Sequence, residues 1–129
     1  MMPVRVLVID SLPPRREMVE KALEEAGFST VSAADAIGGL LSLHRERPDL
    51  VVMESALPLT GAGRVLGSIR KNERTRRIPV ILLTDDAEQE STAGLGGDGL
   101  EFHLPASVGP ETVVAAARKM VAASDLACA

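Results

Sequence analysis

The chain alternates short apolar runs with segments of helical periodicity, and this alternation most limits what it can fold into. Residues 4–9, 50–53 and 78–83 are nearly continuous apolar runs rich in β-branched side chains, as expected for strands buried on both faces of a parallel sheet. Residues 28–33 and 100–103 are weaker strand segments. Because the connections are short, each crossover between strands is expected to be right-handed. The pattern predicts an α/β fold with helices on both faces of one sheet.

Five helices are predicted between and after these strands. The first has Ser11 or Leu12 near its cap and Pro14 in its first turn, and Gly27 ends it. The second begins after Asp35, a favourable N-cap. Helical spacing predicts buried faces formed by Met18, Val19, Ala22, Leu23 and Ala26; by Ile37, Leu40, Leu41 and His44; by Val65, Leu66 and Ile69; and by Val113, Val114, Ala117, Met120 and Val121.

The fourth helix, over residues 87–95, is expected to be short or frayed, because four glycines lie within residues 94–99 and each glycine inside a helix costs about 1 kcal/mol. A sheet of this size fits the flavodoxin-like, doubly wound order 2-1-3-4-5, with five parallel strands and five helices. The 129 residues are expected to form one domain over 1–123, followed by a C-terminal tail over 124–129.

The composition argues against several classes of partner. The 14 Lys and Arg residues are outnumbered by 18 Asp and Glu residues, whereas nucleic-acid binding draws on a basic surplus. With no Trp, no Tyr and two Phe residues, a base-stacking platform is not expected. No apolar run approaches the ~20 residues of a membrane span, and the single cysteine, Cys128, cannot form an internal disulfide. These features predict a cytoplasmic protein that contacts neither nucleic acid directly nor a membrane.

Ligands of doubly wound sheets bind beyond the carboxyl ends of the strands, at the point between the first and third strands where the winding reverses. The polar residues at the predicted strand ends are Asp10, Glu54 and Thr84, with the end of the fifth strand beside them. Chemistry is therefore expected at this edge of the sheet.

Several joined motifs give the chain a resemblance to the CheY-like receiver domains of bacterial response regulators, over essentially its full length. The motifs are Val-Leu-Val-Ile-Asp at 6–10, Arg-Pro-Asp-Leu-Val-Val-Met at 47–53, Leu57-Pro58, Arg77-Ile78-Pro79-Val80-Ile81, Leu83-Thr84 and Pro105. Each motif is weak alone, whereas their order and spacing together are strong.

The resemblance implies a role for each residue at the strand ends. In this family an aspartate that ends the third strand accepts a phosphoryl group, two acidic residues after the first strand hold Mg²⁺, a Thr or Ser ends the fourth strand, and a lysine precedes a cis-proline after the fifth. The matching positions here are Glu54 as the phosphoacceptor equivalent, Asp10 and Ser11 in the acidic pocket, Thr84 at the switch threonine, Leu104 at the lysine, Pro105 as the cis-proline candidate, and Glu101 or Phe102 at the switch aromatic.

Three of the five chemical positions differ from the family pattern, which indicates an atypical receiver, or pseudo-receiver. Glu54 carries its carboxylate about 1.3 Å farther than an aspartate would, and a misplacement on the order of 1 Å can cost about 100-fold in rate. Ser11 removes a Mg²⁺ ligand, and Leu104 removes the ammonium group that would neutralise a phosphoryl oxygen. We therefore expect a binding module and not an enzyme, which acts in two-component (phosphorelay) signalling through protein–protein contacts and independently of phosphorylation.

Without the lysine, Asp10 and Glu54 are two carboxylates in one pocket, an arrangement that is electrostatically unfavourable. We expect a divalent ion, a proton or a rearranged arginine to lie between them. No cofactor is expected beyond weakly bound Mg²⁺, with Asp10 and Glu54 as its candidate ligands. Glu54 has two interpretations: a mimic of the phosphorylated state that holds Thr84 toward the pocket, or a solvated carboxylate in a decayed site.

Two other functions stay open at this point. A phosphorelay could use Glu54 or Ser55 as its acceptor, and a flavodoxin-type domain could bind a small ligand, although residues 10–14 offer no glycine for a phosphate loop. The expected partner is a protein, either an output domain, a kinase or another signalling protein, bound through the last helix.

Two further features have two interpretations each. His103 is interpreted as a simple strand residue, with a hydrogen bond to Glu54 or Glu101 as the alternative. The basic cluster at the end of the third helix is either a solvated helix terminus or a docking patch for an acidic partner; it comprises Arg70, Lys71, Arg74, Arg76 and Arg77.

Overall fold

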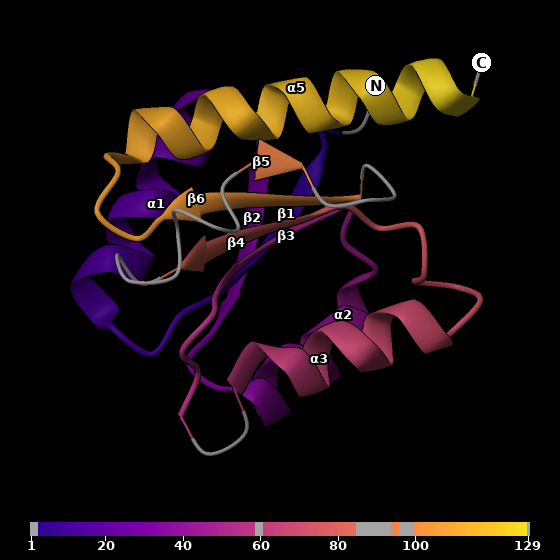
Figure 1. The fold of residues 1–129 in the computed structure, drawn as a ribbon. Coiled ribbons are helices and arrows are strands. Elements are labelled where there is room, and N and C mark those ends of the chain that lie inside the picture. Colours follow the sequence, from indigo (N-terminus) through magenta and orange to yellow (C-terminus); the bar gives the residue numbers. More distant parts are fainter. Residues whose placement is uncertain (1–2, 59–60, 85–93, 96–99, 129) are drawn as a thin grey trace.

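The structure is a computed structural model, and it describes residues 3–58, 61–84, 94–95 and 100–128. These residues form a sheet in the order β2-β1-β3-β4-β6-β5, shown in Figure 1. The strands are β1 (Arg5–Ile9), β2 (Ser29–Ala33), β3 (Leu50–Glu54), β4 (Val80–Thr84), β5 (Gly94–Leu95) and β6 (Glu101–Pro105). With β6 as the fifth parallel strand, the predicted order 2-1-3-4-5 is confirmed.

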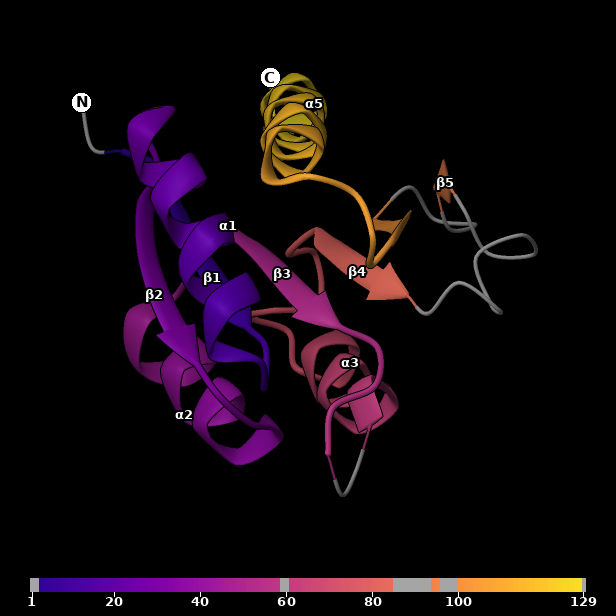
Figure 2. The same cartoon turned by 90° about the vertical axis from the view of Figure 1, so that its left-hand side faces the viewer.

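The sheet lies between two layers of helices (Figure 2). One core packs α1 (Pro13–Glu25) and α5 (Pro110–Cys128) on one face, through Leu23 and Ala117 among others. The other core packs α2 (Ala36–Glu46) and α3 (Gly61–Lys71) on the opposite face. Neighbouring residues of β1, β3 and β4 alternate between the two cores and are buried throughout, apart from the half-buried Arg5. Their continuous apolar runs follow from burial on both faces.

The expectation of five helices is corrected to four within the described part of the chain. Most of the helix predicted over 87–95 lies outside the described residues. Gly94 and Leu95, which are described, form the short strand β5, paired antiparallel with Phe102 and His103 of β6. Gly94, which disfavours a helix at its position, is extended here and pairs with His103.

The predicted helix ends are largely confirmed. Leu12 is the N-cap of α1, with proline in the first turn. Asp35 caps α2, and its side chain accepts a hydrogen bond from the Gly38 backbone N–H at 2.7 Å. After α1 the backbone N–H of Gly27 donates to Glu24 O, and that of Phe28 donates to Leu23 O. This pair of bonds is a Schellman motif, and Gly27 provides its left-handed residue with φ +99°.

Replacing Gly27 with alanine is expected to lower the free energy of unfolding by about 1–2 kcal/mol, because a side chain is disfavoured at this positive φ. Gly67→Ala is the matched control: Gly67 lies inside α3, where a Cβ would contact nothing within 4 Å, so alanine should stabilise by about 0.5–1 kcal/mol. Urea unfolding measures both changes. A Gly27→Ala protein as stable as the parent would contradict this account of the helix end.

The predicted inward face of α2 is wrong at Ile37, Leu41 and His44 but holds at Leu40, which packs against the core. The predicted face of α1 is wrong at Met18. Ile37 and Leu41 are 72% and 58% exposed, Met18 is 55% exposed, and His44 is also exposed. The buried residues of α2 are Ala36, Gly39 and Leu43. A Cβ on Gly39 would lie 2.6 Å from Ile9 Cδ1, so the helix approaches β1 through its small residues. With Gly39 against the sheet, Ile37 and Leu41 lie on the outer side of the helix.

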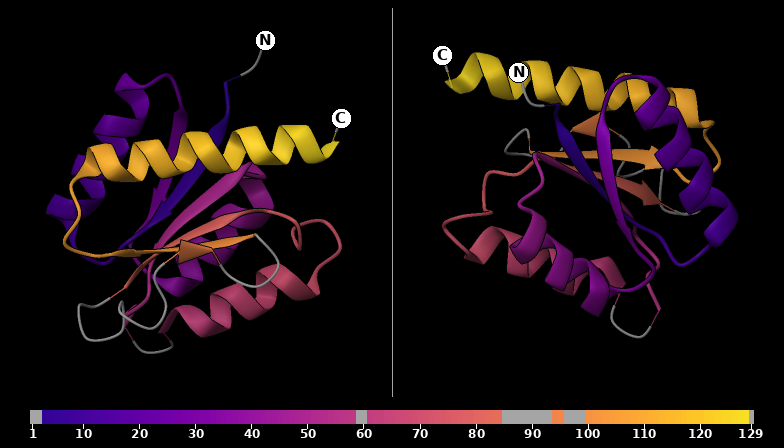
Figure 3. Two further views of the ribbon diagram at one scale, coloured as in Figure 1. Left: turned by 45° about the horizontal axis from the view of Figure 1, so that its top comes forward. Right: turned by 180° about the vertical axis from the view of Figure 1, so that it is seen from behind.

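The last helix is longer than expected. α5 runs beside α1 (Figure 3) and continues to Cys128, through most of the segment predicted as a tail. The boundary at residue 123 stays a prediction. Among the described residues, no helix combines the length and apolar character needed to cross a membrane.

Candidate functional site

The predicted site residues come together at one edge of the sheet. Asp10 directly follows β1, Glu54 ends β3 and Thr84 ends β4. Parallel register aligns these ends, since Ile9 pairs with Met53 and Glu54 with Leu83. Thr84 in turn pairs with Pro105 of β6.

An arginine side chain bridges the two carboxylates. The Arg15 guanidinium, from the first turn of α1, donates through Nε to Asp10 Oδ2. Its Nη2 donates to Asp10 Oδ1 at 3.0 Å and to Glu54 Oε2 at 2.6 Å. The side chains of Asp10 and Glu54 are 2% and 6% exposed, and that of Arg15 is 25% exposed. Of the three occupants expected between the carboxylates, the structure therefore places an arginine there.

Backbone groups of the β1–α1 loop complete the bonding of both carboxylates. The Ser11 N–H donates to Glu54 Oε1 at 2.7 Å, and the Leu12 N–H donates to Asp10 Oδ1 at 2.9 Å. The neighbouring Arg16 instead donates to the Asp10 main-chain carbonyl at 2.8 Å. Each carboxylate oxygen of Asp10 and Glu54 thus accepts at least one hydrogen bond.

Arg15 stays charged in this setting. Its hydrogen bond to Asp10 raises the pKa of the guanidinium; partial burial opposes that rise, and the charges of Asp10 and Glu54 support it. The N-cap residue of α1, Leu12, donates its backbone N–H to Asp10, so this carboxylate lies at a helix start, where negative charge is favoured. With both carboxylates ionised, the three side chains carry a net charge of −1.

Neither interpretation of Glu54 matches the structure in full. Its carboxylate is buried and ion-paired, so the solvated version is wrong. The Thr84 hydroxyl donates to the Leu104 main-chain oxygen at 3.3 Å. This bond joins β4 to β6 and is not made to Glu54, which the interpretation as a mimic of the phosphorylated state expected to hold Thr84. Leu104, at the lysine-equivalent position, is buried in the core beneath α1 and α5.

The expectation of a cis bond before Pro105 is corrected, because the described residues contain no cis peptide. Pro105 is the last residue of β6, and its register with β4 continues through Thr84. An extended strand keeps its direction through a trans bond, which is also the lower-energy form by about 0.5–1 kcal/mol.

The remaining residues of β6 lie apart from the carboxylates. Glu101 pairs with Arg70 at 3.3 Å, and Phe102 packs against the core. The His103 Nδ1 atom is buried and has no hydrogen-bond partner among the described residues, so the alternative interpretation, a bond to Glu54 or Glu101, is not realised through that atom.

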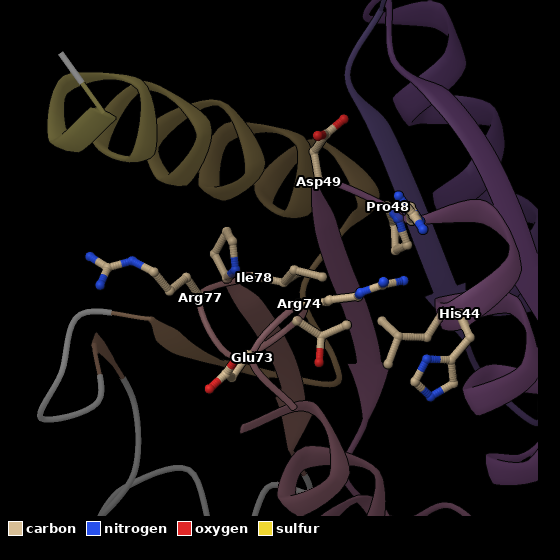
Figure 4. A pocket seen from close by; sticks show the side chains of 11 residues that line it. His44, Pro48, Asp49, Glu73, Arg74, Arg77 and Ile78 are labelled. Carbon is tan, nitrogen blue, oxygen red and sulfur yellow. The ribbon is translucent and has the colours of Figure 1, made fainter. Parts of the chain in front are cut away.

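Two residues of the basic cluster, Arg74 and Arg77, line a separate groove at the other end of the sheet, before β3 and β4 (Figure 4). Its charges do not converge: Arg74 extends toward His44, whereas Arg77 points away. Arg70 is half-buried and not a free surface charge, since it donates to the carbonyls of Arg76, Ile78 and Leu100. The groove is lined by Leu43, His44, Arg47, Pro48, Asp49, Glu73, Arg74, Thr75, Arg77, Ile78 and Pro79.

Arg15 was not identified from the sequence, although a signal for it exists. The first turn of α1 contains no acidic residue and carries two arginines, against the preference for negative charge at a helix N-terminus. Basic side chains so placed, five residues after Asp10 and at the carboxyl edge of the sheet, indicate a local anionic partner.

The chain matches the model of the response regulator receiver domain over residues 6–118. It belongs to that family. This receiver domain is 39% identical over 99 residues to TcrX of Mycobacterium tuberculosis, covering 74% of the chain and 42% of TcrX. It spans about half the length of the curated relatives that it matches.

Solved structures confirm the CheY-like fold. The chemotaxis response regulator CheY4 of Vibrio cholerae superposes with a TM-score of 0.82 at 22% identity, covering 92% of this chain and 99% of CheY4. The receiver domain of the sensor histidine kinase PA1611 from Pseudomonas aeruginosa has a TM-score of 0.79 at 23% identity, covering 94% and 99% of the two chains. The PA1611 domain was solved with a magnesium ion coordinated in its active site cleft.

The residues of this receiver domain do not fit a magnesium ion as they are arranged. Mg²⁺ demands near-octahedral oxygen ligands and is usually held by one or two carboxylates. Here Ser11 replaces one acidic residue, and the lone pairs of Asp10 and Glu54 face the Arg15 guanidinium. Within the described residues, no third His, Cys, Asp or Glu side chain joins them as a metal-binding group.

Proposed function

We propose that this receiver domain works without phosphorylation, as a protein-binding module of two-component (phosphorelay) signalling and not as an enzyme. The observation that carries the proposal is the bonding of Glu54. Ser11 N–H occupies one carboxylate oxygen at 2.7 Å, and Arg15 occupies the other at 2.6 Å. A carboxylate bound in this way has little nucleophilic character, because its lone pairs and charge are already engaged.

The described residues around Glu54 also lack groups that would stabilise a transferred phosphoryl group. Phosphoryl transfer depends on cations that neutralise the equatorial oxygens in an in-line geometry. The lysine position holds Leu104, whose side chain is part of the core. The longer Glu54 side chain would also displace an attacking oxygen by about one bond length.

The test is incubation of the purified domain with acetyl phosphate and Mg²⁺, followed by intact-mass analysis. We expect no gain of a phosphoryl group. The variant Ser11→Asp/Glu54→Asp restores two family residues, and its folding is checked by circular dichroism. Its gain in mass under the same conditions is compared with that of the parent protein. A phosphoryl group on the parent protein at Glu54 or Ser55 would favour the rival function, an active phosphoacceptor receiver, and would end this proposal.

The proposed partner is another protein, contacted through the last helix. A shallow groove between α1 and α5 is lined by small and apolar side chains with charged residues around them: Ala22, Glu25, Ala26, Pro110, Glu111, Val114, Ala115 and Arg118. The curated relatives are named as transcriptional regulators and are about twice as long as the aligned region. An output domain is therefore the partner class that we propose, with a kinase or another signalling protein as the alternatives. Any contact with DNA would then belong to the output domain.

A further inference from the structure

The Arg15 bridge joins two buried carboxylates that would otherwise repel each other. Three carboxylate oxygens accept hydrogen bonds from this one guanidinium: both oxygens of Asp10, and Oε2 of Glu54. We propose that Arg15 is the resident counter-ion of the strand-end pocket, and that it excludes divalent cations from a latent site formed by Asp10 and Glu54. This inference rests on the proposed function and deepens it, since it explains why the pocket of a receiver domain that works without phosphorylation does not bind a divalent cation.

Arg15 and a divalent cation would compete for the same atoms. A bound Mg²⁺ requires carboxylate oxygens at about 2.1 Å, and the oxygens that face the pocket already accept from Nε and Nη2 of Arg15. Two cations on these oxygens would also repel each other. Binding of the ion therefore requires the guanidinium to leave.

The tether gives Arg15 the advantage in this competition. A group held on a short segment of its own chain acts at an effective concentration on the order of millimolar or more. Arg15 is five residues from Asp10, on a helix whose start is fixed by the Leu12 N–H bond to Asp10. The backbone of this segment is ordered when the protein folds, so only the Arg15 side chain itself remains to be ordered when the bridge forms.

Removal of the guanidinium should uncover the latent site. Asp10 and Glu54 would then be two like charges in a pocket of low exposure, and a divalent cation relieves such repulsion. Arg16 provides a matched control: it adjoins Arg15 and carries the same charge, but it donates to the Asp10 carbonyl and not to a carboxylate.

The experiment compares the parent, Arg15→Ala and Arg16→Ala proteins by thermal unfolding, in EDTA and in 10 mM Mg²⁺. Mg²⁺ should raise the unfolding midpoint of Arg15→Ala by about 5 °C if the site binds at millimolar affinity, with less than about 1 °C for the parent and Arg16→Ala. Mn²⁺ then serves as a paramagnetic probe in NMR. It should broaden the Ser11 amide, which contacts Glu54, in Arg15→Ala alone.

Each outcome is decisive. Mn²⁺ broadening of Ser11 in the parent protein would overturn the inference, as would an Arg15→Ala protein that gains no Mg²⁺ response, or an equal gain in Arg16→Ala. Adding Asp10→Asn to Arg15→Ala should abolish the gain. If Arg15→Ala does not fold, Arg15→Gln, which keeps hydrogen-bond donors but no charge, is measured instead. Failure here is distinct from failure of the proposed function, which is read from phosphoryl uptake by the parent protein.

Discussion

Arg15→Met should lower the free energy of unfolding at neutral pH by about 3–5 kcal/mol, measured by urea denaturation in the presence of EDTA. Methionine keeps a long side chain but leaves Asp10 and Glu54 as buried carboxylates without their cation, and breaking a buried pair in this way is among the costlier single changes. Arg15 is itself one-quarter exposed, which favours the lower part of this range.

Arg16→Met is the control for this prediction, because it removes the same charge from the same turn of α1. Its loss should stay near 1 kcal/mol, the contribution of a hydrogen bond to a main-chain carbonyl. Equal losses for the two variants would mean that the bridge adds nothing specific. If the bridge acts as described, a double-mutant cycle between Arg15→Met and Glu54→Gln should give a coupling energy of about 0.5–3 kcal/mol. This energy separates the Arg15–Glu54 interaction from the effect of each substitution alone.

Truncation of the core under α3 should have a comparable effect. Ile69 is fully buried against the face of the sheet that α2 and α3 cover, so Ile69→Ala should cost about 2–5 kcal/mol from lost burial and the cavity left behind. Ile37→Ala is the matched control, since Ile37 is 72% exposed and its truncation should change stability by less than about 0.5 kcal/mol. If Ile37→Ala proved the more damaging, the orientation of α2 described above would be wrong.

This pair of isoleucines also marks how far the sequence determines the fold. Periodicity placed Ile69 inward correctly, because α3 has a single hydrophobic face. It failed for Ile37, because α2 has two faces that could be buried and the choice depends on Gly39 fitting closely against Ile9. A contact between distant residues decides that choice, and no local pattern contains it.

The candidate site, too, could be predicted from the sequence only in part. Parallel strands that end together bring Asp10, Glu54 and Thr84 to one edge, so their meeting follows from strand order alone. The sequence also required something to offset two adjacent carboxylates. Which group does so depends on the path of a side chain from the first turn of α1, and Arg15 became identifiable only from its contacts. The bond before Pro105 was inferred from resemblance, and in this chain the strand continues through it.

The short antiparallel strand β5 makes the sheet asymmetric toward other molecules. It pairs along β6 at Phe102 and His103, so the main chain there already has a neighbour from the same molecule. At the opposite margin, β2 is the edge strand of the described sheet, and its residues Ser29–Ala33 are half-buried or exposed. An unprotected edge is the usual site of strand addition by a second polypeptide, and of the two edge strands β2 offers five residues for such pairing whereas β5 offers two.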